Sequence, residues 1–363
     1  MSLKKWGLLI LTATSIIACN NDDDDDNNAV ETNIFDNLDS NPNARLLYET
    51  VANLQPIETF NIPFTDPTPG KRVDFQFNGP ITGEISGEFI GYDYSKFPTQ
   101  QNGNVAIDVF GTITTHDGVK IAFRYKGESF QTGPLTSNIQ ETGYLSTNHP
   151  DYAFVNDLFI IPVGDIDLAT NQISVKYYAF ENDPFNGNNP YAEETLPDYY
   201  NFPFTWDNIQ TNPDATFVYE ASVNTTGIEG FGANPTDVFT GAYPIPAEGL
   251  RMDIDFAGTT QGEINGDISG VDYVVVNPDG SLTLNVRGKI ETTNGAVISL
   301  KVNGISVAST TPGTSNLFET IELKSGHSDF NYLNDKYIIG VGTSDAATGL
   351  LSLRLYRFDQ NPL

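Results

Sequence analysis

The sequence predicts an all-β protein made of two tandem antiparallel β-barrels, each with about eight strands. The first observation behind this prediction is an internal duplication. The stretch TGEISGEFIGYDY at 82–94 returns as QGEINGDISGVDY at 261–273. Ser137–Glu181 also aligns with Ser315–Asp359 without a gap, and 19 of these 45 positions are identical. Chance alone gives only a few identities, so the two halves are copies of one unit.

The second observation is a strict alternation of apolar and polar residues. Val105, Ile107 and Val109 are separated by single residues, which is typical of a strand with one buried face. Turn sequences such as His116-Asp117-Gly118 and Asn277-Pro278-Asp279-Gly280 separate such runs. The predicted strands lie at 46–53, 73–77, 84–95, 105–114, 119–130, 138–146, 157–165 and 172–180, and then at 216–224, 250–258, 263–276, 281–293, 296–308, 316–324, 335–343 and 349–358.

Strands that follow one another through short turns close most simply into a barrel, because closure leaves no exposed sheet edge. An open sandwich is the alternative. A barrel of this size is filled by its own side chains or holds one small ligand. The predicted domains are a first barrel at 45–181 and a second at 216–363, and each is long enough to bury a core of its own.

The overall charge excludes one class of partner. The chain has 18 Lys and Arg against 47 Asp and Glu, for a formal net charge of −29. Such a field repels the phosphates of nucleic acids and anionic membrane surfaces. It is typical of a protein kept soluble in an extracellular setting, and attraction of cations is the alternative.

The first residues resemble an export signal. Lys4 and Lys5 precede an apolar run from Trp6 to Ala18, which is too short to span a bilayer comfortably. The run ends in Ile16-Ile17-Ala18-Cys19, which resembles the lipobox of bacterial lipoproteins, where the cysteine is lipidated and becomes the mature N-terminus. We therefore expect a lipoprotein signal peptide at 1–18 and a lipid anchor on Cys19. An ordinary signal peptide is the alternative, and a single cysteine excludes a disulfide within the chain.

An acidic segment follows this cysteine. The sequence NNDDDDDNN at 20–28 carries too much like charge to fold, so residues 19–44 are predicted to form a flexible tether. The segment is similar to the one that follows the lipidated cysteine in surface-exported lipoproteins of Bacteroidota. The resemblance implies an outer-membrane lipoprotein exposed at the cell surface and bound to the membrane through Cys19 alone.

The segment between the copies is rich in proline and aromatic residues. Residues 182–215 show no periodicity typical of a long helix or strand, yet they include Tyr199, Phe202, Phe204 and Trp206. A simple linker rarely holds so many aromatic rings. We expect them to pack the linker onto one or both barrels, and an aromatic platform at a ligand entrance is the alternative.

Several motifs of the second copy occur in a characteristic order. Gly270-Val271-Asp272-Tyr273 is followed by Thr293-Asn294-Gly295-Ala296, Phe318-Glu319-Thr320 and Phe330-Asn331-Tyr332-Leu333-Asn334. This succession resembles the bacterial family named domain of unknown function 3237. The resemblance implies an antiparallel β-barrel like those of lipocalin-like and allene-oxide-cyclase-like proteins. It implies no activity, and the family's usual member is a single barrel.

The duplicated Asp-Tyr dipeptides are the best candidates for a ligand site. They are Asp93-Tyr94 and Asp272-Tyr273, and Asn156 and Asn334 come next. A carboxylate and a phenol near a barrel mouth would serve as base and acid, if burial raised the pKa of the aspartate toward neutrality. The alternative is structural, because an aspartate two residues after a glycine can bind backbone N–H groups at a bulge.

The copies differ on one strand face. Asp108 and Phe110 of the first copy align with Asn285 and Arg287 of the second, while the apolar positions between them keep their character. This variable face is either exposed to solvent or part of a specialised lumen. If it lines the lumen, we expect Arg287 to pair with Asp272 or with a ligand carboxylate, and the second barrel to prefer an anionic or carbonyl-bearing ligand.

No catalytic or metal motif stands out. The three histidines, His116, His149 and His327, lie in predicted loops with too few partners for a zinc site, so we expect no metal and no cofactor. Three functions stay open for the sequence alone. They are a surface lipoprotein that binds a small, partly apolar molecule, a cofactor-free lyase, cyclase or isomerase, and an interaction module of an envelope complex whose protein partners the sequence does not identify.

Overall fold

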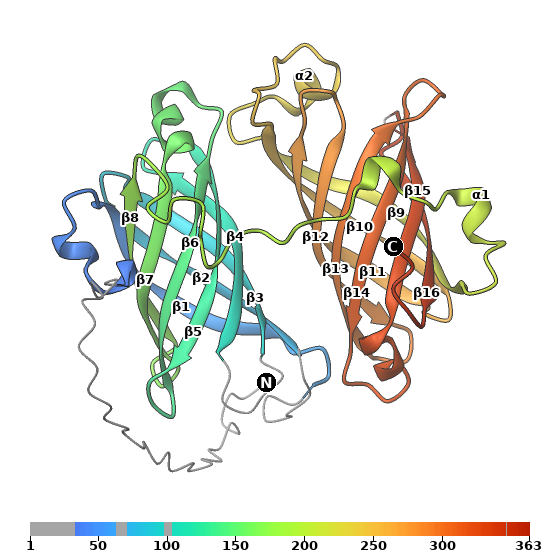
Figure 1. The fold of residues 1–363 in the computed structure, drawn as a ribbon, viewed down its shortest axis with the longest axis horizontal. Coiled ribbons are helices and arrows are strands. Elements are labelled where there is room, and N and C mark those ends of the chain that lie inside the picture. Colours follow the sequence, from blue (N-terminus) through green and yellow to red (C-terminus); the bar gives the residue numbers. More distant parts are fainter. Residues whose placement is uncertain (1–32, 63–70, 98–103, 346) are drawn as a thin grey trace, which may run out of the picture.

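The computed structural model describes residues 33–62, 71–97, 104–345 and 347–363. It contains two closed antiparallel barrels of eight strands each, which confirms the predicted fold class. The barrels lie side by side, with the segment that joins them running between them (Figure 1). The predicted signal peptide, Cys19 and the acidic run lie outside the described residues. No helix among the described residues is long and apolar enough to cross a membrane.

Each barrel is a meander in which every strand pairs with its neighbours in the sequence. The first comprises β1 (Arg45–Glu58), β2 (Arg72–Gly83), β3 (Gly87–Lys96), β4 (Val105–Thr115), β5 (Lys120–Gln131), β6 (Thr136–Ser146), β7 (Phe159–Asp167) and β8 (Gln172–Phe180). The second comprises β9 (Thr216–Glu229), β10 (Leu250–Gly262), β11 (Gly266–Val276), β12 (Leu282–Thr292), β13 (Val297–Ala308), β14 (Thr314–Lys324), β15 (Tyr337–Asp345) and β16 (Leu350–Phe358). Pairing of β8 with β1 and of β16 with β9 closes the barrels.

Short helices occupy the connections. They are η1 (Ile34–Asp36), η2 (Leu38–Ser40), η3 (Pro150–Asp157), η4 (Tyr199–Asn201), α1 (Trp206–Ile209), α2 (Pro235–Phe239) and η5 (Asn331–Asp335). The first two fall in the predicted tether, and here the structure differs from the prediction. Leu38 is buried with Ile161 and Tyr178, and the Asp39 carboxylate accepts hydrogen bonds from Lys176 and Tyr178. An apolar contact and two polar ones therefore hold this segment on the first barrel.

Repeated glycines let the strands pack closely around an aromatic ring in each barrel. Phe77 of β2 lies opposite Gly91 of β3, and Phe256 of β10 lies opposite Gly270 of β11. A Cβ atom on Gly91 would lie 2.0 Å from the ring of Phe77, and one on Gly270 would lie 3.0 Å from that of Phe256. Glycine at these two positions therefore makes room for a large lumen side chain.

The aromatic linker packs on the outside of both barrels. Its first part contacts the first barrel, where the ring centroids of Phe185 and Phe159 are 5.8 Å apart. Its second part contacts the second barrel, where Phe202 lies 5.7 Å from Phe318 and the guanidinium of Arg354 lies 4.1 Å from the ring of Trp206. The linker thus crosses from one barrel to the other as a packed strap (Figure 1).

The barrels meet through equivalent surfaces. The hydroxyl groups of Tyr94 on β3 and Tyr273 on β11 are 2.7 Å apart, and the rings of Tyr273 and Phe110 stack at 4.0 Å. Arg72 pairs with Asp74 on β2, and Arg251 pairs with Asp253 at the equivalent positions of β10. The interface therefore has an approximate two-fold symmetry, like that of a homodimer.

Two reciprocal contacts extend this symmetry. Phe60 and Phe231, which follow β1 and β9, have left-handed backbones with φ of 54° and 49°. The carbonyl of Phe60 accepts a hydrogen bond from the N–H of Gly326 at 2.9 Å, and that of Phe231 accepts one from the N–H of Asn148 at 2.7 Å. Each barrel therefore extends one arm onto the other.

Candidate functional site

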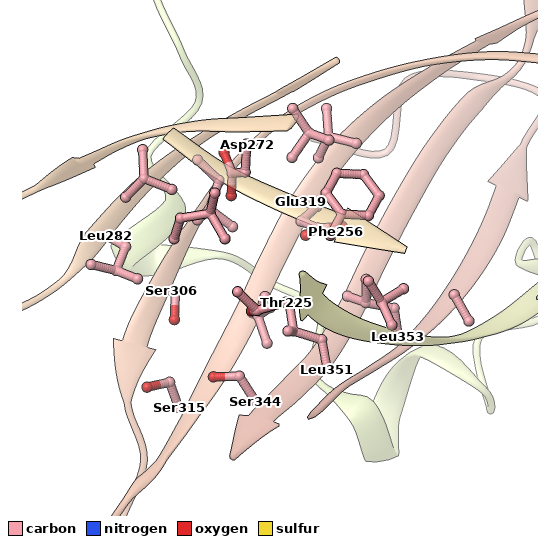
Figure 2. A pocket seen from close by; sticks show the side chains of 18 of the residues that line it. Thr225, Phe256, Asp272, Leu282, Ser306, Ser315, Glu319, Ser344, Leu351 and Leu353 are labelled. Carbon is pink, nitrogen blue, oxygen red and sulfur yellow. The ribbon is translucent and has the colours of Figure 1, made fainter. Parts of the chain in front are cut away.

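Each barrel encloses a cavity in its lumen. The cavity of the second barrel measures about 340 Å³ and that of the first about 310 Å³. Aliphatic residues form most of the wall in the second barrel, including Leu284, Val286, Leu300 and Val302. Serines lie where strands end, and Figure 2 shows Ser306, Ser315 and Ser344 on one side of the cavity.

Two carboxyl groups interrupt the apolar wall of the second barrel. Asp272 of β11 and Glu319 of β14 both line the cavity, and Figure 2 shows them on the same side of it. Burial raises the pKa of Asp272 to about 7. Burial, together with the charge of Asp272, raises the pKa of Glu319 to about 8. A carboxylic acid is therefore present in this lumen near neutral pH.

The first barrel repeats the pair at equivalent positions. Asp93 of β3 and Glu141 of β6 line its cavity. Burial raises the pKa of Asp93 to about 7, and burial with the nearby charge of Asp93 raises the pKa of Glu141 well above its usual range. Both copies of the unit therefore keep an Asp-Glu pair in a largely apolar lumen.

Neighbouring strands make room for these side chains. Glu141 lies opposite Gly127, and Glu319 lies between Gly304 and Gly340. A Cβ atom on Gly127 would lie 2.8 Å from the Cγ of Glu141, and one on Gly340 would lie 2.8 Å from Oε2 of Glu319. The glutamates therefore extend over backbone that carries no side chain.

Asp93 and Asp272 have two roles, since each lines a cavity and each binds a backbone N–H group. Oδ1 of Asp272 accepts a hydrogen bond of 2.8 Å from the backbone N–H of Asn285, and Oδ1 of Asp93 accepts one of 3.3 Å from that of Asp108. Each carboxyl thus serves as a backbone partner on the adjacent strand while it lines the cavity. A second partner of Asp93 is the hydroxyl of Ser95, at 2.6 Å.

The two lumens differ in polarity. Three buried tyrosines, Tyr48, Tyr125 and Tyr177, lie inside the first barrel, and the hydroxyls of Tyr48 and Tyr125 are 2.7 Å apart. In the second barrel Tyr219 keeps the position of Tyr48, but Val302 and Leu355 replace the other two. The first cavity is therefore the more polar of the two.

The tyrosines of the Asp-Tyr dipeptides do not share the lumen with the aspartates. Successive residues of a strand point to opposite faces, so Tyr94 and Tyr273 point out of their barrels. They contact each other at the interface between the barrels instead. The predicted acid-base pair of Asp with the adjacent Tyr is therefore wrong.

Arg287 also lies outside the lumen. It is buried at the interface, where Nη2 pairs with the carboxylate of Asp108 from the other barrel and Nη1 donates to Asn285 Oδ1 at 2.6 Å. The variable face therefore meets the partner barrel, and it is neither solvent nor lumen. This position contradicts the expectation that Arg287 pairs with Asp272 or with a lumen ligand.

Asn156 and Asn334 have a structural role at the opposite end of the barrels from the lumen serines. The Asn156 side chain bonds to both the N–H and the C=O of Thr147, each at 2.9 Å. Asn334 bonds in the same way to Ser325, at 2.9 and 3.1 Å. Each asparagine therefore holds the loop that follows β6 or β14, and neither lines a lumen cavity.

Glu141 and Glu319 are not among the predicted site residues, although the sequence contains a signal for them. The segments 136–142 and 314–320 read TSNIQET and TSNLFET, so a glutamate keeps its place in a strand whose neighbours vary. Within the described residues, no cluster of His, Cys, Asp and Glu has the size of a metal site.

Comparisons with known proteins concern the barrel unit. Residues 243–358 match the family model described as "Protein of unknown function (DUF3237)". No curated protein matches the chain. Three solved structures are among the matches, and each covers about two fifths of this chain.

A conserved protein of unknown function from Rhodopseudomonas palustris is 18% identical over 40% of this chain and 99% of its own, with a TM-score of 0.32. A beta-barrel like protein from Acinetobacter baumannii is 19% identical over 39% and 94%, with a TM-score of 0.33. A protein with unknown function from Clostridium acetobutylicum is 20% identical over 40% and 98%, with a TM-score of 0.31. Through residues 243–358, the second half of this chain is therefore similar to the DUF3237 family.

Proposed function

We propose that each barrel binds a small, largely apolar molecule in its lumen and holds an oxygen of that molecule through a carboxylic acid. The observation that carries the proposal is the same in both copies, namely an apolar cavity with one Asp-Glu pair in its wall. A protonated carboxyl donates a hydrogen bond to a carbonyl or hydroxyl oxygen. A few such polar groups in an apolar wall are typical of small-molecule sites.

The size of the cavities limits the ligand. Volumes of about 340 and 310 Å³ lie at the lower end of the range for ligand sites. The aliphatic wall of the second barrel favours an aliphatic or alicyclic ligand with one oxygen. The tyrosine hydroxyls of the first barrel favour a ligand with more than one polar group.

Binding is tested by calorimetry of the full chain against ketones, alcohols and carboxylic acids of matched size. Leu284→Trp fills the second cavity and should abolish the binding that belongs to it. Tyr337→Trp, at an exposed position of β15, is the matched control and should bind as the wild type does. Binding that survives Leu284→Trp unchanged, or no saturable binding by any member of the panel, contradicts the proposal for this barrel.

A second function, proton transfer on the bound molecule, is favoured by the raised pKa values. With pKa values of about 7 and 8, Asp272 and Glu319 provide one ionised and one protonated carboxyl near neutral pH. Such a pair acts as general base and general acid in enolisation. Deuterium incorporation next to the carbonyl of a bound ketone, followed by NMR, is the test. Asp272→Asn should stop incorporation and leave the ketone bound.

The location of the protein is part of the proposal. The apolar run before Cys19 and the acidic segment after it support lipid anchoring of the mature chain at the outer membrane, facing outward. Cys19→Ser should then release the protein from the membrane fraction. If the variant stays with the membranes after a salt wash, the anchor assignment is wrong.

A further inference from the structure

A second kind of cavity lies at the junction between the barrels, under the linker. It measures about 170 Å³, and Leu284 is the one residue that it shares with the lining of either lumen cavity. Five basic residues line it, namely Arg124, Lys126, Arg251, Arg287 and Lys301. The whole chain has only 18 Lys and Arg against 47 Asp and Glu. More than a quarter of the cationic side chains of an acidic protein therefore gather around one small space.

The cations are packed closely there. The guanidinium carbons of Arg124, Arg251 and Arg287 lie 4.3, 5.4 and 5.5 Å from the centre of one ring, that of Phe110. Burial and the nearby charge of Arg287 lower the pKa of Lys301. Like charges held this closely in a buried place favour the arrival of an anion.

Arg251 has unused donors at this site. Its Nε donates to Asp253 Oδ1 at 2.9 Å, but its Nη1 and Nη2 are buried and have no hydrogen-bond partner. The equivalent arginine of the first copy is fully bonded, since Arg72 donates from Nε and Nη2 to Asp74 and from Nη1 to the carbonyl of Leu300 at 2.9 Å. The two-fold symmetry therefore breaks at the arginine that lines the cavity.

The linker already places a carboxylate in this cavity. Nη2 of Arg124 bonds to Glu193 Oε2 at 2.7 Å, its Nε bonds to Oε1, and Lys126 lies 3.2 Å from Oε2. The Glu193 side chain is 54% exposed, so it contacts the cations from the solvent side. The neighbouring Glu194 lies 3.7 Å from Lys301 and is 67% exposed. Glu193 thus shows how a carboxylate sits in this site.

The remaining acidic partners lie deeper. Asp108 contacts Arg287 and lies 3.6 Å from Arg124, and Asp253 holds the Nε of Arg251. With Glu193 and Glu194 these are the four carboxylates that form ion pairs with the five cations within the described residues, and neither linker carboxylate is bonded to Arg251. A ligand that displaces Glu193 therefore leaves the five cations with three paired carboxylates.

We propose that the junction cavity binds a small oxyanion, a carboxylate or phosphate, which displaces Glu193 and bonds to Nη1 and Nη2 of Arg251. A guanidinium presents two parallel N–H groups that match two oxygens of such an anion. The cavity has space for several water molecules or one anion of this size. The ligand binds between the barrels and leaves both lumens free.

The test is a calorimetric titration of the purified full chain at constant ionic strength, with chloride as the background anion. Inorganic phosphate and sulfate form one arm, and acetate and succinate form the other, so the arms separate phosphate-type from carboxylate ligands. We expect saturable binding in one arm with about one site per chain. Glu193→Gln removes the competing carboxylate and should tighten this binding several-fold.

Two arginine variants form a matched pair. Arg251→Met should weaken the binding at least about tenfold, as expected for the loss of charge-assisted hydrogen bonds. Arg72→Met alters the equivalent, fully bonded arginine and should leave the affinity unchanged. If Arg251→Met does not fold, the increase in anion affinity expected for Glu193→Gln tests the proposal in its place. No saturable binding in either arm, unchanged affinity in Glu193→Gln, or equal losses in the two arginine variants overturns the proposal.

Discussion

At the scale of single residues, the glutamates in the lumens are unusual because they are buried acids without a partner among the described residues. Within the described parts of the chain, Glu141 and Glu319 are each only 4% exposed, and neither has a hydrogen-bond or ion-pair partner. A buried acid of this kind avoids the desolvation of a charge by staying protonated. Its raised pKa therefore links the stability of each barrel to pH.

We predict that this linkage is measurable for Glu319. Its pKa rises from 4.5 in the unfolded chain to about 8 in the folded protein, so the folded state holds the proton longer. Below pH 4.5 the group contributes its full stability, and that contribution is lost as pH rises toward 8. The stability of the wild type relative to Glu319→Gln should therefore fall by up to about 1.4 kcal/mol per pH unit in this window.

Urea unfolding at pH 5, 6, 7 and 8 measures this difference. Glu248→Gln, at an exposed position, is the matched control for the loss of one carboxyl group. Parallel pH profiles for the wild type and Glu319→Gln would show that Glu319 is not protonated in the folded protein.

The second prediction for single residues concerns the stability that the ion pair of Arg287 with Asp108 contributes. Removing one member of a buried ion pair leaves the other charge without a partner, and this costs about 3–5 kcal/mol. Arg287→Met should therefore lower the free energy of unfolding by about 3 kcal/mol and leave ligand binding in the lumen unchanged. Adding Asp108→Asn to Arg287→Met should recover part of the loss.

A double-mutant cycle by urea unfolding measures the coupling between these two residues. Purely additive effects of the two substitutions would contradict a direct pair across the interface. Arg45→Met, on an exposed pair with Glu84, is the control and should change stability by less than about 1 kcal/mol.

At the scale of strands, the alternation and the turn sequences predicted the strands, and the short connections favoured closed barrels over an open sandwich. The same alternation places Asp93 in the lumen and Tyr94 outside it, because successive residues of a strand point to opposite faces. The position of Arg287 could not be predicted in this way. Alternation says which residues point outward, but it carries no signal that one outward face docks onto a second barrel. The sequence signal for the two glutamates lies in the comparison of the two copies, residue by residue.

The close packing of β3 against Phe77 predicts that a side chain at Gly91 destabilises the first barrel. Gly91→Ala places a Cβ atom within 2.0 Å of the Phe77 ring and should destabilise the protein by about 2–3 kcal/mol, as overpacked cores do. Phe77→Leu removes the atoms that clash, so the double variant should be more stable than Gly91→Ala alone. Thermal unfolding followed by circular dichroism is the measurement. Gly118→Asn is the control, because the turn is open and asparagine tolerates its φ of 85° better than most residues, so its loss of stability should be smaller than that of Gly91→Ala.

At the scale of the whole molecule, the two barrels behave as the halves of a dimer. The contacts that join them come in equivalent pairs, such as Tyr94 with Tyr273 and the arms at Phe60 and Phe231. The symmetry is incomplete at the pair of Asp108 with Arg287, because the equivalent positions of the other copy hold Asn285 and Phe110. The interface itself, and not the linker alone, should therefore hold the barrels together.

Cleavage of the linker tests this expectation. The exposed turn Asn186-Gly187-Asn188 has open space around Gly187, so a protease site inserted there should be cut in the folded protein. The cleaved halves should co-elute from a gel-filtration column as one species. The double substitution of Tyr94 and Tyr273 by alanine removes the central contact and should let the cleaved halves separate. Dissociation of the halves without those substitutions would contradict an interface that stands on its own.

The linker has a consequence for how this interface evolves. Two separate barrels must bind each other from dilute solution, whereas joined barrels meet at an effective concentration of order millimolar. Selection for affinity then relaxes, and one half can change without a matching change in the other. The pairing of Asp108 with Arg287 and the unused donors of Arg251 are differences of this kind. A true homodimer would have to carry each of them twice, so fusion is what allows the two halves to specialise.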